Sequence, residues 1–312
     1  MIDVISGGCG FVGKNMVRKL VELNDKSLII IDDLSVGQHP DEWLSVEKIS
    51  SNQQIEVYQH KSQFIYFLQA DFRDVLYALS KNNTYLHDLI GLEFDGFADV
   101  FHFAAIVGGR AKIDGDPMTV ALDLAIDAQF FKWVCDEKPQ RVLYPSSSAA
   151  YPVDLQREVG AIALKETDID FDAMGKPDMT YGWSKLTGEF LAQIAAAHYG
   201  LHVTCIRPFS GYGEDQDLTY PIPAIARRAA RKEDPFEVWG TGKQGRDFVH
   251  IDDVISAPIT QGQELGNVVI ALDDEELLNL PIVSAASIEE AGFFSRMLDS
   301  IQLFFGGFFS VK

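Results

Sequence analysis

The chain has 312 residues, of which 47% are hydrophobic and 23% are charged, a balance that allows one large domain or two intimate ones. Its net charge of −20 disfavours nucleic acids as partners, because an acidic surface repels phosphate backbones. Only three cysteines are present, which argues against a disulfide scaffold and indicates a reducing compartment, expected to be the cytoplasm. We expect no signal peptide, since the N-terminus lacks a basic segment, and no membrane span, since no apolar run reaches about 18 residues.

Strand-like and helix-like segments alternate along the chain. Short apolar runs predict strands at residues 2–6, 28–31, 64–68, 99–103, 141–144 and 201–206. Segments of helical length, such as 117–134 and 184–198, lie between them. This order predicts βαβ units and a parallel sheet that is buried on both faces, so the expected fold class is α/β. Residues 152–180 and 208–247 are richer in Pro, Gly and Asp and could build a second lobe.

A glycine loop follows the first predicted strand. Gly7, Gly10 and Gly13 stand three residues apart, directly before a segment with helical spacing. In a dinucleotide-binding loop, one glycine allows the tight turn, one lets the backbone approach a pyrophosphate, and one lets helix and strand pack closely. The pyrophosphate then lies at the helix N-terminus, where unpaired N–H groups favour negative charge. The alternative is a glycine-rich turn without a ligand.

Two aspartates end later strands. Asp32 follows the second strand, where a carboxylate can accept hydrogen bonds from both hydroxyls of an adenosine ribose. Because it would also repel a 2′-phosphate, it favours NAD over NADP. A turn or helix-capping aspartate is the alternative. Asp71 ends the third strand and could reach the adenine amino group or be an ordinary loop residue.

Tyr181 and Lys185 are four residues apart, so on a helix they share one face. A free tyrosine has a pKa of about 10 and is a poor base at neutral pH. A neighbouring ammonium and a positive nicotinamide ring would stabilise tyrosinate and lower that pKa. A hydroxyl partner can come from the serine run 146–148, which follows the fifth strand. The alternative is a surface Tyr and Lys at this spacing by chance.

Further motifs continue this series in order along the chain. They are GGCGFVG at 7–13, DDLS at 32–35, DFRD at 71–74, HFAA at 102–105, SSSAAYP at 146–152, YGWSK at 181–185, RPFSGYG at 207–213, and WG followed by RDFVHIDDV within 239–254. With these motifs, residues 1 to about 255 resemble the extended short-chain dehydrogenase/reductase family, the NAD-dependent sugar-nucleotide epimerases and dehydratases.

The resemblance implies a Rossmann fold with a doubly wound parallel sheet and a small C-terminal substrate lobe. We assign residues 1–207 to the NAD-binding domain, with some lobe loops inserted at 152–180. Residues 208–312 are assigned mainly to the lobe, with 248–257 returning to the Rossmann domain. The lobe is expected to be atypical or shortened, because the residues after 254 do not reproduce the family's later motif.

The resemblance also implies which residues form the site. The expected catalytic residues are Ser147, Tyr181 and Lys185. The residues expected to bind NAD are Gly7, Gly10, Phe11, Val12, Gly13, Asp32, Asp71, Phe72, Ala104, Ala105, Tyr181, Lys185 and Pro208. The expected contacts to a nucleoside-diphosphate sugar are Ser147, Ser148, Ser210 and Arg246. No metal is expected. The family also implies a homodimer through the helix that bears Tyr181 and the helix at 117–134.

Departures from the family pattern indicate which reaction remains. Hexose dehydratases place Asp-Glu directly after the catalytic hydroxyl, where this chain has Ser148 and Ala149. Sugar-acid decarboxylases use a Glu nearby, and 3,5-epimerases and GDP-fucose synthases carry a cysteine where Ala149 stands. By elimination, the sequence predicts a C4 epimerase (an isomerase) that acts through a transient 4-keto sugar and bound NAD. The alternatives are a sugar-nucleotide reductase, dehydrogenase or dehydratase of the same family, or a non-catalytic NAD-binding sensor.

Arg246 lies where relatives contact the substrate's diphosphate, and its fork of donors suits that contact. We expect Arg246→Ala to weaken the binding of nucleoside diphosphates by roughly 30- to 100-fold, because the loss of a charge-assisted bidentate contact has an effect of that size. Calorimetric titration with UDP, GDP and CDP measures this change. Unchanged affinity for all three would instead assign Arg246 to an ion pair with Asp247 or Asp252.

Overall fold

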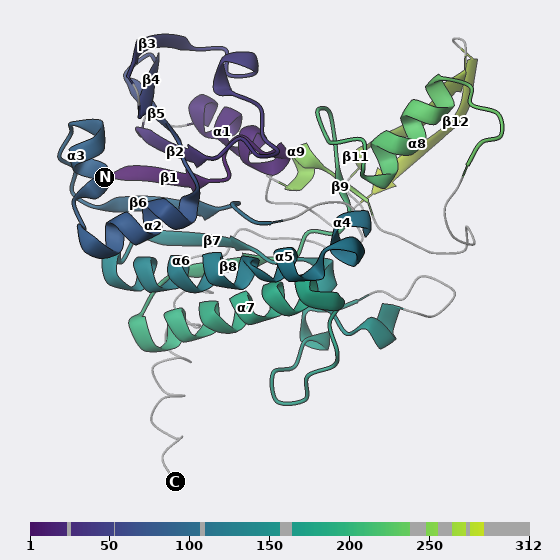
Figure 1. Ribbon diagram of the computed structural model, residues 1–312. Helices are drawn as coiled ribbons and strands as arrows, with labels where there is room; N and C mark the ends of the chain where they lie inside the picture. The colour runs from purple at the N-terminus through teal and green to yellow at the C-terminus, as the bar shows by residue number, and fades with distance from the viewer. Residues whose placement is uncertain are drawn as a thin grey trace. The chain divides into compact units, whose positions relative to one another are not determined.

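The computed structural model describes residues 1–23, 26–52, 54–106, 110–156, 164–237, 248–254, 264–272 and 275–283. The chain divides into two units, Met1–Ile251 and Asp252–Lys312. The first unit contains an eight-stranded sheet in the order β3-β4-β5-β2-β1-β6-β7-β8 (Figure 1). Its strands are β1 (Ile2–Ser6), β2 (Leu28–Asp32), β3 (Glu47–Ser51), β4 (Ile55–His60), β5 (Gln63–Gln69), β6 (Phe97–His102), β7 (Arg141–Pro145) and β8 (Val203–Ile206).

The six strands β5-β2-β1-β6-β7-β8 are parallel, and they are the six that the sequence predicts. The Rossmann-like α/β fold is thereby confirmed. The antiparallel hairpin of β3 and β4 extends the sheet beyond β5 and was not predicted. β3 has the sequence EKISS and is mostly exposed, so it lacks the apolar run that marks a buried strand.

Helices cover the sheet on both faces. The helices of the first unit are α1 (Phe11–Leu23), α2 (Phe72–Lys81), α3 (Tyr85–Ile90), α4 (Arg110–Gly115), α5 (Pro117–Ala121), α6 (Asp123–Glu137), α7 (Met179–Tyr199) and α8 (Pro221–Ala230). Short 3-10 turns occur at Pro40–Glu42, Ser148–Ala150, Val153–Gln156 and Glu166–Asp168. The short parallel pair β9 (Gly211–Tyr212) and β10 (Val249–His250) lies apart from the main sheet. α9 (Ile251–Val254) follows β10.

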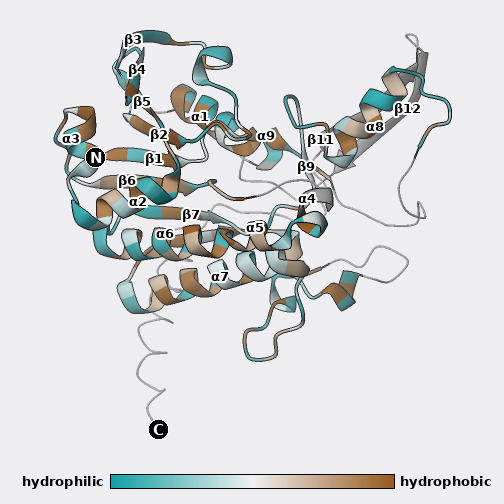
Figure 2. Cartoon of the chain, viewed as in Figure 1, coloured by the Kyte–Doolittle hydropathy of each residue, from teal (hydrophilic) through white to brown (hydrophobic). Residues whose placement is uncertain are grey.

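The core has two layers, one on each face of the sheet. Val4 belongs to the layer that α2, α6 and α7 cover, whereas its neighbour Ile5 belongs to the layer that α1 covers. This alternation follows from the period of two along a strand. All five residues of β1 are buried, and hydrophobic colour runs along β1 and β2 in Figure 2. The continuous apolar runs of the sequence therefore mark strands covered on both sides.

The segment 117–134 forms two helices where the sequence suggests one. α5 ends at Ala121 and α6 begins at Asp123, with Leu122 between them. The Leu122 backbone N–H donates to the Thr119 carbonyl at 3.1 Å, so the chain tightens into a three-residue turn there. The break places Asp123 in the first turn of α6.

The second unit has two described strands, β11 (Glu264–Leu272) and β12 (Glu275–Val283), which form an antiparallel hairpin. The aromatic C-terminal end falls outside the described residues, as does residue 258, where a proline suggests a helix end. The domain boundaries given above therefore remain predictions. No described helix is both long and apolar enough to cross a lipid bilayer.

α6 and α7 lie side by side against β7 (Figure 1), and a glycine makes this contact possible. A Cβ atom at Gly188 of α7 would overlap the hydroxyl of Tyr144, which is fully buried on β7. The Tyr144 hydroxyl donates to Asp127 Oδ2 at 2.6 Å. A larger residue at 188 would therefore displace Tyr144 and break this buried hydrogen bond.

We expect Gly188→Ala to lower the free energy of unfolding by about 1–3 kcal/mol, the usual range for overpacking a core. Urea denaturation measures the change. Gly115→Ala is the matched control, because Gly115 also lies in a helix but a Cβ there would meet nothing within 4 Å. Equal stability of the two variants would contradict the steric role of Gly188.

Candidate active site

The predicted site residues gather where the parallel strands end. Gly7 follows β1, Asp32 ends β2, Ala104 follows β6, Ser147 follows β7, and Pro208 follows β8. Because parallel strands present their carboxyl ends at one edge, these residues share that edge of the sheet. Ligands of open α/β sheets bind at this edge.

The glycine loop is shaped by two close approaches, at Gly7 and at Gly13. Gly7 has φ of +68°, and a Cβ there would lie 2.5 Å from the Ala104 nitrogen. A Cβ at Gly13 would overlap the Gly7 carbonyl, so α1 can pack tightly on the loop only without one. Among the described atoms, a Cβ at Gly10 would meet only the Gly7 oxygen, at 3.5 Å. Gly10 is therefore the open point of the loop, directly before α1, and its surroundings fit a pyrophosphate.

Asp32 is buried and tied to the loop by backbone hydrogen bonds. Its Oδ2 accepts from the Cys9 N–H at 2.9 Å, and its Oδ1 accepts from the Leu34 N–H at 2.8 Å. Burial raises the pKa of this carboxyl, while the backbone donors oppose the shift. A carboxylate has about four acceptor positions, so positions remain for ribose hydroxyls.

Ser146 and Ser147 are adjacent in sequence but have different partners. Ser146 is buried, and its hydroxyl donates to Glu189, which also pairs with Arg207. Ser147 caps the following 3-10 turn, with its Oγ accepting from the Ala149 N–H at 3.1 Å. Its side chain also hydrogen bonds with Tyr181 and thereby lowers the pKa of the phenol.

Gly182 lets the serine segment lie against α7. A Cβ at Gly182 would overlap the Ala149 carbonyl, which in turn accepts from the Asp178 N–H at 3.0 Å. The glycine in the YGWSK motif thus allows Ser147 and Tyr181 to come within hydrogen-bond reach, although they are far apart in sequence.

Lys185 is buried beneath Tyr181 and paired with a carboxylate. Only 2% of its surface is exposed, and its Nζ lies 3.1 Å from Asp123 Oδ2 and 5.9 Å from the Tyr181 ring centre. Burial opposes the charge on Lys185, but Asp127, Asp123 and Tyr181 raise its pKa above the ordinary value. The lysine therefore stays protonated, as the predicted catalytic role requires.

The pKa of Tyr181 nevertheless lies above its ordinary value. Burial raises it most, and the Asp123 and Asp127 carboxylates add to the rise, whereas Lys185 and Ser147 oppose it. The expectation that Lys185 favours tyrosinate is thus met in direction but outweighed by burial and the two aspartates.

Asp123 and Asp127 lie in the candidate active site but belong to none of the sequence motifs described above. Both are fully buried, and they stand four residues apart on α6, so they share one face of that helix. Two aspartates at helical spacing within the apolar stretch VALDLAIDAQFFKWV were a signal that could have found them. His102, which contacts Asp127 at 3.1 Å and Ser6 at 2.8 Å, is buried as well.

Other predicted positions are placed less directly. Asp71 caps α2 and pairs with Arg73, with its Oδ2 2.6 Å from the Arg73 Nη2. The Phe72 ring packs in the core, with its centre 5.6 Å from the centre of the His102 ring. Only the Phe72 backbone could therefore reach a cofactor. Several other predicted cofactor- and substrate-binding residues are half-buried: Phe11, Val12, Ala105, Ser148, Pro208 and Ser210. Arg246 falls outside the described residues.

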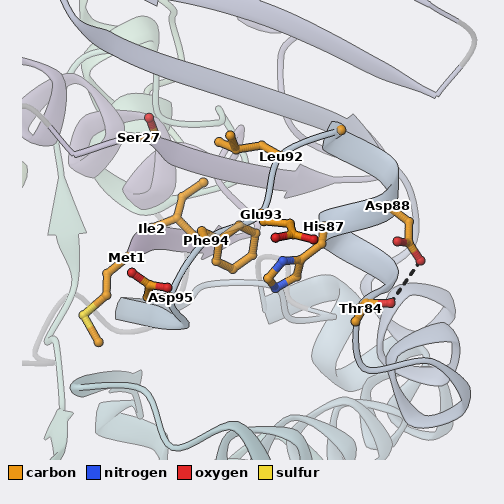
Figure 3. A pocket seen from close by; sticks show the side chains of 11 residues that line it. Met1, Ile2, Ser27, Thr84, His87, Asp88, Leu92, Glu93, Phe94 and Asp95 are labelled. Atoms are coloured by element: carbon orange, nitrogen blue, oxygen red, sulfur yellow. Dashed lines mark hydrogen bonds between the residues drawn. The ribbon is translucent and has the colours of Figure 1, made fainter.

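A surface pocket of about 920 Å³ lies at the other edge of the sheet. Figure 3 shows that its lining includes Met1, Ile2 and Ser27, which stand at the amino ends of β1 and β2. His87 and Phe94 stack across it at 3.8 Å. It is therefore separate from the candidate active site.

Several curated proteins are similar to this chain. A UDP-glucose epimerase of Bacillus subtilis, YtcB, described as uncharacterized, is 24% identical over 253 residues, which are 81% of this chain and 69% of that protein. The GDP-mannose 3,5-epimerase 1 of Oryza sativa subsp. indica is 23% identical over 298 residues, 88% of this chain and 69% of that protein.

Among solved structures, the UDP-glucose 4-epimerase of Thermotoga maritima with UDP-glucose superposes with a TM-score of 0.61 at 23% identity, covering 81% of this chain and 71% of that one. A sequence model of the NAD dependent epimerase/dehydratase family matches residues 4–267. Since that match spans most of the chain and the fold agrees, the protein belongs to the NAD dependent epimerase/dehydratase family.

Proposed function

We propose that this protein is a nucleoside-diphosphate-sugar epimerase that inverts C4 of the sugar through a transient 4-keto sugar, with NAD as its resident cofactor. The observation that carries the proposal is the grouping of Ser147, Tyr181 and Lys185, next to a serine segment that supplies no acid of its own. The segment 146–151 contains serines, alanines and a tyrosine, but no carboxylate or thiol. Dehydration or carbon-acid epimerisation needs such a second group.

The glycine loop supports NAD as the cofactor. The open position at Gly10 faces the N-terminus of α1, and Asp32 stands at the end of β2, where a ribose would bind. Phe11, Val12, Gly13, Ala104 and Ala105 would line the same site. When bound, NAD would supply the acceptor for a hydride from the sugar carbon and the donor for its return to the opposite face, so the reaction would have no net redox change.

The residues of the chain move one proton and hold one oxygen. Tyr181 takes the proton of the sugar 4-hydroxyl as the carbon–hydrogen bond breaks, and returns it to the same oxygen after the keto sugar has turned. Ser147 holds that oxygen by a hydrogen bond, and Lys185 stabilises the tyrosinate by its charge. Burial of Lys185 and its carboxylate partners keeps the ammonium fixed during both half-reactions.

The relatives support a sugar nucleotide as the substrate. They include a UDP-glucose 4-epimerase of Mycolicibacterium smegmatis and a GDP-mannose 3,5-epimerase of Oryza sativa, and one solved neighbour holds UDP-glucuronic acid with NAD. We assign residues 208–247 and 152–180 to the substrate lobe, where Ser148, Ser210 and Arg246 would contact the diphosphate sugar.

A homodimer and a cytoplasmic location complete the proposal. The outer faces of α6 and α7 expose large apolar side chains: Leu124 is 37% exposed, Trp183 41% and Phe190 47%. Such a face suits a second copy of the chain better than water.

We expect NAD to bind more tightly than NADP because the Asp32 carboxylate repels a 2′-phosphate. Asp32→Ala should lower the ratio of the NADP and NAD dissociation constants by roughly tenfold, since the repulsion is removed. Asp32→Asn separates charge from shape, because an amide can keep an acceptor at Cys9 or Leu34 without the negative charge. Calorimetric dissociation constants measure the effect. Equal or tighter binding of NADP to the unaltered protein would refute the role of Asp32.

The epimerase itself is tested in deuterated water. A UDP-, GDP- or CDP-hexose should equilibrate with its 4-epimer without taking deuterium onto carbon, because the hydrogen leaves C4 and returns to C4 without reaching the solvent. Proton NMR measures the amount of the 4-epimer, and deuterium NMR measures deuterium on the ring carbons. No reduced cofactor should accumulate.

Three outcomes would contradict this function. Solvent deuterium at C3 or C5 would indicate carbon-acid epimerisation, and accumulation of reduced NAD would indicate a dehydrogenase. Tyr181→Phe is the control variant: it should bind NAD but lose turnover, because only the proton acceptor is removed. Full activity of this variant would place the site elsewhere.

A further inference from the structure

A fully buried carboxylate connects two parts of the candidate active site. Asp123 has none of its surface exposed, and its two oxygens contact different elements. Oδ2 lies 3.1 Å from the Lys185 Nζ on α7. Oδ1 accepts from the Ile106 backbone N–H at 3.0 Å, directly after Ala104 and Ala105. The same carboxylate thus holds the ammonium and the loop that follows β6.

The groups around Lys185 and Tyr181 come from several elements. Asp123 and Asp127 face the ammonium from α6, and the Tyr144 ring lies 5.3 Å from it on β7. Asp127 is held by Tyr144 and by His102 of β6. Tyr181 is influenced by the same two aspartates, by Lys185, by Ser147, and by Tyr220, which precedes α8.

Carboxylates outnumber the ammonium in the cluster that faces Tyr181. Two carboxylates surround a single ammonium, and all three groups are buried. Buried charges a few ångströms apart interact more strongly than charges in solvent. Burial raises the pKa of Tyr181 most, and each carboxylate adds to that rise by offsetting part of the ammonium's effect on the phenol.

We propose that Asp123 is a positioning residue of the active site: it fixes the Lys185 ammonium and the 104–106 loop together, and its charge sets how readily Tyr181 gives up its proton. This inference rests on the proposed roles of Tyr181 and Lys185. It assigns to the first turn of α6 a control over proton transfer that the catalytic residues alone do not provide. Removing the charge while keeping the shape should make Tyr181 a stronger acid.

The test measures Tyr181 directly, in the full-length protein saturated with NAD and without sugar. Tyrosinate formation is followed by ultraviolet absorbance as the pH rises, up to the pH at which circular dichroism shows unfolding. Subtracting the titration of Tyr181→Phe isolates this residue from the other tyrosines, of which the chain has ten in all. We expect Asp123→Asn to ionise Tyr181 at lower pH than the unaltered protein does.

Two further variants keep the test decisive. Asp136→Asn is the matched control, because it removes one carboxylate from the same helix at an exposed site, where Asp136 pairs with Lys132. Its midpoint should equal that of the unaltered protein. Asp123→Ser replaces Asp123→Asn if the amide does not fold, since a hydroxyl can still accept from Ile106.

A midpoint that is unchanged or higher in the Asp123 variants would overturn the proposal, because a merely structural aspartate would not move it. With a sugar nucleotide present, the acid limb of the pH profile of kcat should move to lower pH in Asp123→Asn. On that limb, a shift of one pH unit changes the rate at a given pH by about tenfold. A lower midpoint without turnover of any sugar nucleotide would support the role of Asp123 while refuting the epimerase, so the two failures are distinguishable.

Discussion

The buried ammonium of Lys185 joins three elements at the candidate active site. It lies on α7, pairs with Asp123 on α6, and stands over the ring of Tyr144 on β7. A charge in this place would be costly without partners, and breaking such a pair usually costs several kcal/mol. The requirement to keep Lys185 charged therefore constrains the positions of α6 and α7 and of β7, which lies between them in the sequence. Tyr181 and Ser147 can meet only while that arrangement holds.

Glycines provide the space for this arrangement. Gly188 makes room for Tyr144, and Gly182 makes room for the Ala149 carbonyl, so α7 lies close to both β7 and the serine segment. On the other side of the site, Gly7 and Gly13 bring β1, α1 and the end of β6 together. The close packing positions the catalytic side chains, whereas Gly10 alone leaves space that a ligand can fill.

The parallel strands and the order of motifs were predictable because both are local. A strand buried on two faces is a continuous apolar run, and the residues after it fall at the sheet edge whatever the side-chain contacts. The serines could not be distinguished in this way. Ser146 and Ser147 are adjacent in sequence, and only their contacts separate them: Ser146 binds Glu189, whereas Ser147 caps the following turn and acts on Tyr181. The choice of Ser147 came from the family resemblance.

Asp123 and Asp127 were missed for a related reason: their partners come from other elements, so the sequence shows only two acidic residues in a helix. The β3–β4 hairpin was missed because its strands alternate polar and apolar residues weakly and lie at the edge of the sheet. Arg246, which only the resemblance singles out, stays a prediction, as do the cofactor roles of Asp71 and Pro208.

The hairpin also has a consequence for how copies of the protein meet. An exposed edge strand offers unpaired backbone groups to any other strand, which is a common route to aggregation. Here the last strand, β3, carries Glu47 and Lys48, and its register shifts between Lys48 and Ser50. Lys48 pairs with Asp41 and lies 2.8 Å from Glu56 Oε2. Continuing the sheet into a neighbour would require desolvating these charges, so growth of the sheet beyond β3 is opposed.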